Sequence, residues 1–322
     1  MTDLRIIFMG TAELSCASLA VLARDEIFNV VAAVTQPDKP KGRDLKSQPS
    51  PVKSLALKLG LPVLQPERAR DEKFIAELRA LRPDLMVVVA YGQILPQSIL
   101  DLPRHGCLNV HTSLLPKYRG AAPIQWAIAN GDAETGVTIM KMDAGLDTGP
   151  IVFQRPAAIT ASDDSATLHD RLAHLGAELL AQTIPDYIAG KIVPVPQPVE
   201  GVSYAAKIKK EDGHIDWHQP AQRIWNRLRA FTPWPGAFTS FNGRLLKISR
   251  GSIAEEIWNK ENPLANLGIK PGTILSAKKK GIIVACGKDF LQITELQREG
   301  GRRMNAAEFL AGHPLKAGEK FV

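Results

Sequence analysis

A continuous apolar run, Leu-Met-Val-Val-Val-Ala at residues 85–90, most constrains the fold of this chain. A strand that is apolar at every position has both faces covered, which is typical of a parallel sheet with helices on either side. Shorter apolar runs at 5–9 and 28–34 predict further strands, and segments with helical spacing alternate with them at 50–59, 72–81 and 123–130. A longer helix is expected after Ser165, its predicted N-cap. The first half is therefore predicted to be a doubly wound α/β domain with a mainly parallel sheet.

The second half has a different pattern, and a Pro- and Val-rich stretch at 193–199 separates the two. This composition favours an extended connection, so we place a linker at 190–206, between domains at 1–189 and 207–322. Beyond the linker, short apolar runs are broken by Gly, Asn and Lys at 238–241, 244–249, 272–276, 281–285 and 290–296. Such a pattern predicts a small β-barrel or β-sandwich.

Composition and cysteine usage indicate a cytoplasmic protein. No apolar run approaches the roughly 20 residues that a membrane-spanning helix needs, and no basic leader with a long apolar segment is visible. The three cysteines, Cys16, Cys107 and Cys286, are too widely spaced for a disulfide framework or a zinc site. Cys107 could be a nucleophile near His111, but a small buried strand residue is the favoured interpretation.

The net charge of +7 is unevenly distributed. Residues 207–322 hold 20 Lys and Arg against 11 Asp and Glu, a net charge of +9, whereas residues 1–206 carry −2. The second half is therefore either a face for a polyanion or merely a basic soluble domain. Arg223, Arg227 and Arg229 are among its candidate phosphate contacts, while Trp225 and Trp234 are expected in the core.

A polar pair within an apolar segment supplies the strongest indication of chemistry. Asn109 and His111 alternate with Leu108 and Val110, so a buried strand would carry an amide and an imidazole on one face at its carboxyl end. Open parallel sheets build their sites at that end. Together with an acid such as Asp147 downstream, this set suits a reaction that forms an oxyanion and moves protons, as acyl transfer to an amine does. A lone pair of this type is usually structural, but the segment 113–120 that follows contains a Pro, a Gly and two cations and is typical of a functional loop.

Asn-Val-His at 109–111, the segment 113–120 and Leu-Asp-Thr-Gly at 146–149 resemble the folate-dependent formyltransferases. The resemblance covers essentially the whole chain through the segments 36–43, 120–125 and 230–235, and is strongest to the branch that acts on methionyl initiator tRNA. It implies a Rossmann-like catalytic domain followed by an OB-like tRNA-binding domain. It also implies 10-formyltetrahydrofolate as formyl donor, no metal, the amino group of methionyl initiator tRNA as acceptor in translation initiation, and a monomer without membrane contact.

The resemblance assigns roles to particular residues. It makes Asn109, His111 and Asp147 catalytic, and it places Leu14 in the methionine pocket. The residues that it assigns to the folate are Val89, Tyr91, Gly92, Ser113, Leu114, Leu115, Pro116 and Asp143. Those that it assigns to tRNA are Lys41, Gly42, Arg43, Lys46, Lys207, Lys209 and Lys210. Asp44 and Leu45 stand where a more basic or glycine-rich run is expected, and Leu14 stands where the family usually has Phe.

Two other functions compete with this one. A formyltransferase for an amino sugar or another small amine would share the Asn109, His111 and Asp147 set, but the basic second half argues against it. A non-catalytic nucleic-acid-binding protein would share the basic half, but the intact polar set argues against that.

Overall fold

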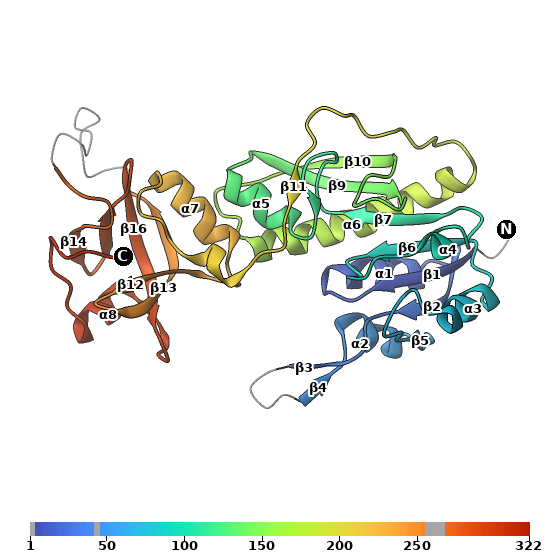
Figure 1. The fold of residues 1–322 in the computed structure, drawn as a ribbon, viewed down its shortest axis with the longest axis horizontal. Helices are drawn as coiled ribbons and strands as arrows, with labels where there is room; N and C mark the ends of the chain where they lie inside the picture. Colours follow the sequence, from blue (N-terminus) through green and yellow to red (C-terminus); the bar gives the residue numbers. More distant parts are fainter. Residues whose placement is uncertain (1–3, 42–45, 255–267) are drawn as a thin grey trace. The chain divides into compact units, whose positions relative to one another are not determined.

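The computed structural model describes residues 4–41, 46–254 and 268–322, which form two compact units (Figure 1). The first unit comprises the chain up to Pro123 with Glu134–Ala158 and His169–Ala205. The second comprises Ile124–Ala133, Ile159–Leu168 and the chain from Ala206 onward.

A single sheet organises the first unit, with strands in the order β10-β9-β7-β6-β1-β2-β5 among the described residues (Figure 1). The run from β7 to β5 is parallel, whereas β9 is antiparallel to both of its neighbours. The predicted apolar strand is β6, buried at every position. The mainly parallel α/β fold is therefore confirmed. The strands are β1 (Leu4–Gly10), β2 (Phe28–Val34), β5 (Val63–Leu64), β6 (Leu85–Val89), β7 (Cys107–His111), β9 (Glu134–Lys141) and β10 (Ile151–Ala158).

Local capping explains where the helices begin. Ser50 caps α2 as its position predicts, because its hydroxyl accepts the Lys53 amide at 3.0 Å. The expected cap of α6 was wrong: Asp164 accepts the amides of Ala166 and Thr167, while Ser165 donates its hydroxyl to the Thr232 carbonyl. The helices are α1 (Leu14–Arg24), α2 (Pro51–Lys58), α3 (Glu72–Ala80), α4 (Gln97–Leu100), α5 (Pro123–Asn130) and α6 (Ser165–Ile188).

Two small strand pairs accompany the main sheet of the first unit. The hairpin β3 (Lys39–Lys41) and β4 (Lys46–Gln48) lies between β2 and α2 along the chain, with Lys41 opposite Lys46. The pair β8 (Arg119–Gly120) and β11 (Tyr204–Ala205) is parallel and joins the loop after β7 to the segment that the sequence predicts as a linker.

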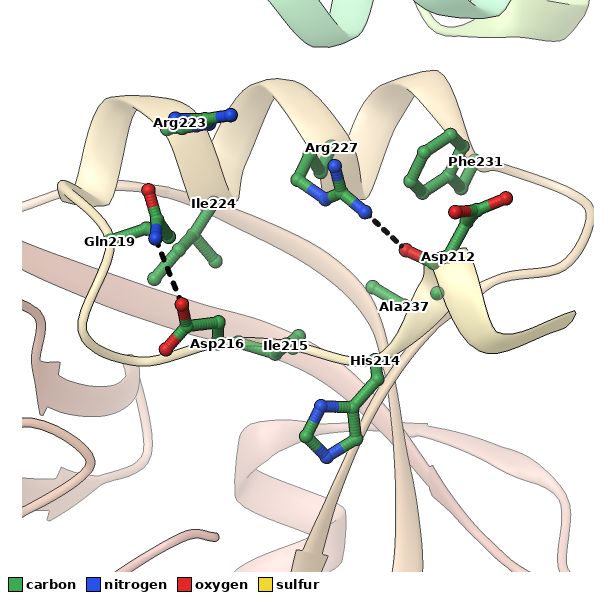
Figure 2. Close-up of a pocket in the computed structure, with 11 residues that line it drawn as sticks. Asp212, His214, Ile215, Asp216, Gln219, Arg223, Ile224, Arg227, Phe231 and Ala237 are labelled. Atoms are coloured by element: carbon green, nitrogen blue, oxygen red, sulfur yellow. Dashed lines mark hydrogen bonds between the residues drawn. The ribbon is translucent and has the colours of Figure 1, made fainter. Parts of the chain in front are cut away.

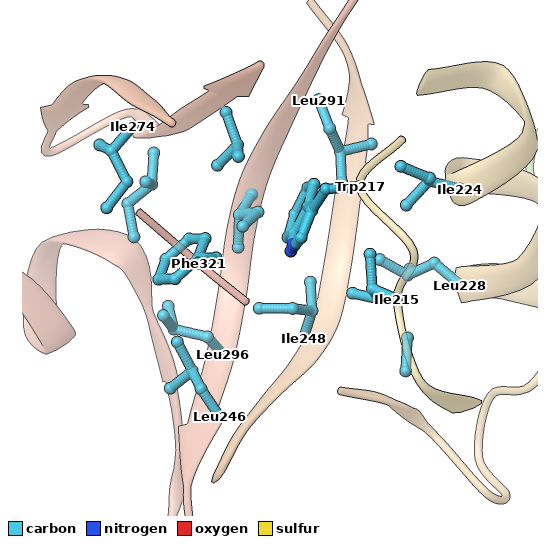
Figure 3. Packing of buried hydrophobic residues seen from close by; sticks show 14 of the residues in the cluster. Ile215, Trp217, Ile224, Leu228, Leu246, Ile248, Ile274, Leu291, Leu296 and Phe321 are labelled. Carbon is cyan, nitrogen blue, oxygen red and sulfur yellow. The ribbon is translucent and has the colours of Figure 1, made fainter. Parts of the chain in front are cut away.

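An antiparallel sheet around one apolar core forms most of the second unit, as expected for an OB-like domain. The sheet order is β12-β13-β16-β15-β14 with β17 beside β16, in the described part of the chain. Trp217 and Phe321 lie inside this core with side chains of the sheet and of α7 (Figure 3). Their rings are stacked, with centroids 5.8 Å apart. The elements are β12 (Ala237–Phe241), β13 (Arg244–Ile253), β14 (Ile274–Lys278), β15 (Gly281–Ala285), β16 (Phe290–Arg298), β17 (Arg303–Asn305), a 3-10 helix (Lys210–Gly213), α7 (Ala221–Ala230) and α8 (Ala306–Gly312).

Among the described residues, no helix is both long enough and apolar enough to cross a bilayer.

The core of the second unit allows a matched test of packing. Val284 on β15 is fully buried, whereas Val322 is 69% exposed. Val284→Ala should lower the free energy of unfolding of this unit by roughly 1.5–3 kcal/mol, because two methyl groups are lost and a cavity remains. Val322→Ala should change it by less than about 0.5 kcal/mol. Urea unfolding followed by tryptophan fluorescence measures both, and equal losses would contradict the packing described.

Candidate active site

The carboxyl end of β7 places the polar pair as the alternation predicts. Asn109 and His111 are 9% and 6% exposed, while Leu108 and Val110 on the opposite face are buried. Parallel pairing with β6, and of β6 with β1, brings the carboxyl ends of these strands to the same edge of the sheet. The amide and the imidazole therefore lie where a parallel α/β sheet builds its site.

Asp147 joins this pair from the loop between β9 and β10. Its Oδ2 accepts the Gly120 amide at 2.8 Å and lies 3.7 Å from His111 Nδ1, while its Oδ1 accepts from Asn109 Nδ2 at 3.4 Å. Asp147 has a φ of +51°, in the left-handed region, which for a residue with a side chain costs on the order of 1 kcal/mol or more. The surrounding loops must therefore hold the Asp147 backbone in place.

The ring of His111 is oriented by a backbone carbonyl. Its Nε2–H donates to the Tyr118 carbonyl oxygen at 2.9 Å, and since a carbonyl can only accept, Nε2 carries the proton of the neutral ring. Nδ1 is then the nitrogen that faces Asp147. At 3.7 Å, beyond hydrogen-bond distance, Nδ1 remains available to exchange a proton with a bound group.

These three side chains have complementary chemical capacities. The Asn109 amide can donate to an oxygen that becomes negative, Nδ1 of His111 can take up or release a proton, and the Asp147 carboxylate can accept hydrogen bonds beside them. Cys107 does not compete as a nucleophile, because it is 1% exposed and burial raises its pKa to about 12. Among the described residues no group of three or more potential metal ligands is found.

The residues assigned to the folate divide into two groups in the structure. Val89, Tyr91, Ser113 and Leu115 are buried, and the Ser113 hydroxyl donates to the Lys117 carbonyl, so its side chain serves the loop itself. Gly92 and Asp143 are exposed, while Leu114 and Pro116 are partly exposed. Asp143 Oδ1 accepts from the Gly145 amide and the Thr148 hydroxyl, which shapes the loop that carries Asp147.

Sequence reasoning missed a network of polar groups at the ends of β1, β2 and β6. The Tyr91 carbonyl accepts from Thr11 Oγ1 at 2.8 Å and from Gln36 Nε2 at 2.9 Å, and Gly92 follows it at a φ of +81°. A Cβ at Gly92 would approach Gln36 Nε2 to 2.6 Å, so only glycine fits this turn. Gln36 opens the segment 36–43 that carries the resemblance, and this was the available signal.

Backbone groups at this end of the sheet could match the amide-like edges of a planar ring system. Backbone groups of the 90–92 turn and of the 143–147 loop present donors and acceptors, and the neighbouring strand ends are apolar. The Tyr91 hydroxyl is buried and has no hydrogen-bond partner, and burial raises its pKa to about 12, so this group is a neutral donor. These residues are therefore compatible with a pterin.

The residues assigned to the acceptor substrate lie in three places. Lys41 and Lys46 belong to the β3–β4 hairpin, while Gly42 and Arg43 lie outside the described residues. Lys207, Lys209 and Lys210 are exposed at the start of the second unit. Leu14 is partly buried at the first position of α1.

A pocket of about 220 Å³ lies in the second unit, between α7 and the 3-10 helix (Figure 2). Arg227 donates to the Asp212 carbonyl at 2.7 Å, and Gln219 donates to Asp216 at 2.8 Å. These polar groups bind one another, and the guanidinium of Arg227 also lies 5.0 Å from the centre of the Phe231 ring. The contacts of Arg227 and Gln219 therefore stabilise the pocket internally.

Two of the predicted phosphate contacts are used within the protein. Arg229 donates to the carbonyls of Thr160 and Asp163, its guanidinium lies 4.3 Å from the Trp225 ring centre, and burial lowers the pKa values of both Arg227 and Arg229. Backbone carbonyls and aromatic rings thus engage both guanidinium groups, which favours a structural role. Trp234, expected in the core, is 57% exposed.

Comparison with known proteins agrees with both units. A family described as formyl transferase matches residues 4–184, and one described as formyl transferase, C-terminal domain, matches residues 207–314. Proteins named methionyl-tRNA formyltransferase from Trichlorobacter lovleyi and Myxococcus xanthus are each 51% identical to this chain, over 99% of its length and 97% and 98% of theirs.

Solved structures show the same fold at much lower identity. WlaRD, a sugar 3N-formyltransferase, superimposes with a TM-score of 0.64 at 18% identity, covering 91% of this chain and 98% of its own. HypX from Aquifex aeolicus gives 0.64 at 17% identity, covering 99% of this chain and 49% of its own. Because both family descriptions match and the relative from Trichlorobacter lovleyi is 51% identical over 99% of this chain, the chain belongs to the formyl transferase family.

Proposed function

We propose that this protein transfers the formyl group of 10-formyltetrahydrofolate to the free amino group of methionyl initiator tRNA. The observation that carries the reaction type is the cluster formed by the buried Asn109 and His111, at the carboxyl end of β7, with the partly buried Asp147. The acceptor is supported by the relatives of 51% identity, which are named for methionyl-tRNA. Their names also support a role in translation initiation.

In this proposal the amine itself attacks the formyl carbon, so no covalent enzyme intermediate is needed. Asn109 Nδ2 donates to the formyl oxygen as its negative charge develops. His111 Nδ1 accepts the proton that the amine loses and returns one to the departing folate nitrogen, and Asp147 stabilises the ring while it is charged. The oriented Nε2–H bond to Tyr118 keeps Nδ1 directed at the reacting groups.

The folate is proposed to lie along the residues that the resemblance assigns, from the 89–92 turn to the 113–116 loop and Asp143. Two structural neighbours were solved with folates: WlaRD with 5-N-formyltetrahydrofolate, and HypX with tetrahydrofolic acid. The exposed Gly92 of the turn supports this placement. No metal is required, since the proposed oxyanion donor and proton carrier are side chains.

The second unit is proposed to bind the tRNA through its net charge of +9 and the exposed Lys207, Lys209 and Lys210. Lys41, Gly42, Arg43 and Lys46 are proposed to reach its acceptor end, with Leu14 in the methionine pocket. We propose domain limits of 1–189 and 207–322, and a cytoplasmic monomer. The three free cysteines support a reducing compartment.

An amino sugar is the alternative acceptor, because structural neighbours include sugar N-formyltransferases. Those proteins are 18% and 19% identical to this chain, against 51% for the relatives named for methionyl-tRNA. The basic second unit also favours a polyanionic substrate. The tRNA is therefore the acceptor that we propose.

Removing either member of the polar pair tests the catalytic assignment. Asn109→Ala and His111→Ala should each lower kcat by on the order of 100-fold or more, because an oxyanion donor or a proton carrier is lost. Steady-state formylation of methionyl-tRNA measures the effect, and circular dichroism confirms folding. His174→Ala, an exposed histidine on α6, is the control and should keep full activity. Near-normal kcat in a folded Asn109→Ala or His111→Ala variant would contradict the assignment.

Removing only the charge of Asp147 tests its role beside the ring. Asp147→Asn should lower kcat for formylation of methionyl-tRNA about tenfold or more, since the ring that becomes charged during the reaction loses a neighbouring negative charge. The matched control is Asp170→Asn, which alters the exposed pair of Asp170 with His169 at 2.9 Å. Full kcat in a folded Asp147→Asn variant would show that Asp147 has only a structural role.

A substitution in the basic segment 41–46 tests whether tRNA is the acceptor substrate. Arg43→Ala should raise the KM for methionyl-tRNA several-fold and leave the KM for the folate unchanged, and the affinity of the parent for tRNA should fall steeply with salt. Arg79→Ala, an exposed arginine on α3, is the control. Formylation at two salt concentrations gives both quantities. Salt-independent tRNA use with an unchanged KM would favour the small-amine acceptor.

A further inference from the structure

The segment predicted as a linker is bound closely to the loops of the active site. Val195 pairs with Ile151 at the start of β10, and Tyr204–Ala205 forms a parallel ladder with Arg119–Gly120. The Ser203 hydroxyl accepts the Tyr118 amide at 2.9 Å. This segment therefore contacts both the residue whose carbonyl orients His111 and the residue whose amide binds Asp147.

Within this segment Gln197 uses all the hydrogen-bonding capacity of its side chain. Its Nε2 donates to the carbonyl of Asp147 at 2.7 Å and to that of Gly149 at 2.8 Å. Its Oε1 accepts from Arg119 Nε at 3.1 Å and Nη2 at 2.7 Å. Four bonds saturate an amide group.

Arg119 fixes which way this amide points. A guanidinium can only donate, so the oxygen of Gln197 must face Arg119 and the NH₂ must face the two carbonyls. Nε and Nη2 form a rigid planar fork, and Arg119 is 9% exposed, so the plane of the amide is fixed as well. The donors of Gln197 are thereby directed at the loop that carries Asp147.

The loop needs such support because Asp147 has its φ in the left-handed region. Its far end is also tightly packed, since a Cβ at Gly149 would approach the Lys141 carbonyl oxygen to 1.9 Å. Gln197 binds the carbonyls on both sides of Thr148, so it holds the stretch from Asp147 to Gly149 in one conformation. The direction of the Asp147 carboxylate follows from that conformation.

We propose that Gln197, oriented by Arg119, is a positioning residue for formyl transfer: it holds Asp147 so that its carboxylate binds the Gly120 amide and faces His111. Gln197 acts through Asp147 and does not itself touch the reacting atoms. The inference rests on the proposed function for its effect on rate, while the hydrogen-bonded arrangement can be tested without any substrate.

Two substitutions of Gln197 test this positioning role. Gln197→Leu keeps a similar volume and removes all four bonds. Gln197→Glu can still accept from Arg119 but, when ionised, cannot donate to the two carbonyls. Both should lower kcat for methionyl-tRNA about 10- to 100-fold, since a misplaced catalytic group reduces the rate steeply, while KM for the tRNA and for the folate stays within about twofold. Arg119→Lys, which keeps the charge and loses the fork, should show a smaller loss.

A matched control exists on the surface of the same unit. Arg155 Nη2 donates to Gln182 Oε1 at 2.8 Å, and this exposed Arg–Gln pair lies on β10 and α6. Gln182→Leu removes an equivalent bond and should leave kcat, both KM values and thermal unfolding unchanged. It shows whether loss of an Arg–Gln hydrogen bond in itself reduces activity.

The Gly120 amide provides a readout that does not depend on activity. In protein labelled with 15N-glycine, its resonance should shift in Gln197→Leu and Gln197→Glu without any ligand, because its bond to Asp147 weakens, and should stay in place in Gln182→Leu. A folded Gln197→Leu variant with parental kcat, or with an unshifted Gly120 amide, would overturn the proposal. If the parent protein fails to formylate tRNA, the proposed function fails, and the Gly120 resonance alone then decides whether Gln197 positions Asp147.

Discussion

The carboxylate of Asp147 is the group on which the geometry of the site depends. It accepts the Gly120 amide and lies beside both Asn109 and His111, so it connects the loop after β7 with the loop after β9. The backbone of Asp147 has its φ in the left-handed region, so other groups must hold it in this conformation. The connecting segment at 195–205, which contains Gln197, supplies the restraint through bonds to both loops.

The chemistry of the site follows from this restraint. The Tyr118 carbonyl places the proton of His111 on Nε2 and leaves Nδ1 toward Asp147, so a single ring nitrogen is left for proton exchange. The amide of Asn109 has two N–H groups, and the long bond to Asp147 uses only one of them. One donor and one proton carrier thus remain for the reacting groups, which is what direct transfer of a formyl group between two amines requires.

The first part of the site could be predicted from sequence because it is local. Alternation along five residues places Asn109 and His111 on one face of β7, and continuous apolarity identifies β6. Other features depend on contacts between distant residues or on the backbone. Nothing near Gln197 in sequence indicates that its amide binds the Asp147 carbonyl, and the orienting partner of His111 is a carbonyl that every residue possesses.

The same reasoning explains why local patterns do not identify the partners of a side chain. Arg227 and Arg229 belong to a helix rich in cations, which suggests a binding face, yet both side chains are half-buried and their guanidinium groups contact backbone carbonyls and aromatic rings. The N-cap of α6 is Asp164 and not the predicted Ser165, because the Asp164 carboxylate accepts the first free amides of the helix. Local patterns locate such residues well, but they do not determine which partner each one binds.

The measurement that tests the central claim most directly is the choice of acceptor. Purified protein is supplied with 10-formyltetrahydrofolate that carries an isotopic label in the formyl group, together with either methionyl initiator tRNA or a nucleotide-linked amino sugar. The account predicts that label enters the methionyl-tRNA, with kcat/KM exceeding that for the sugar by orders of magnitude. Label in the sugar alone, or in neither acceptor, would contradict it.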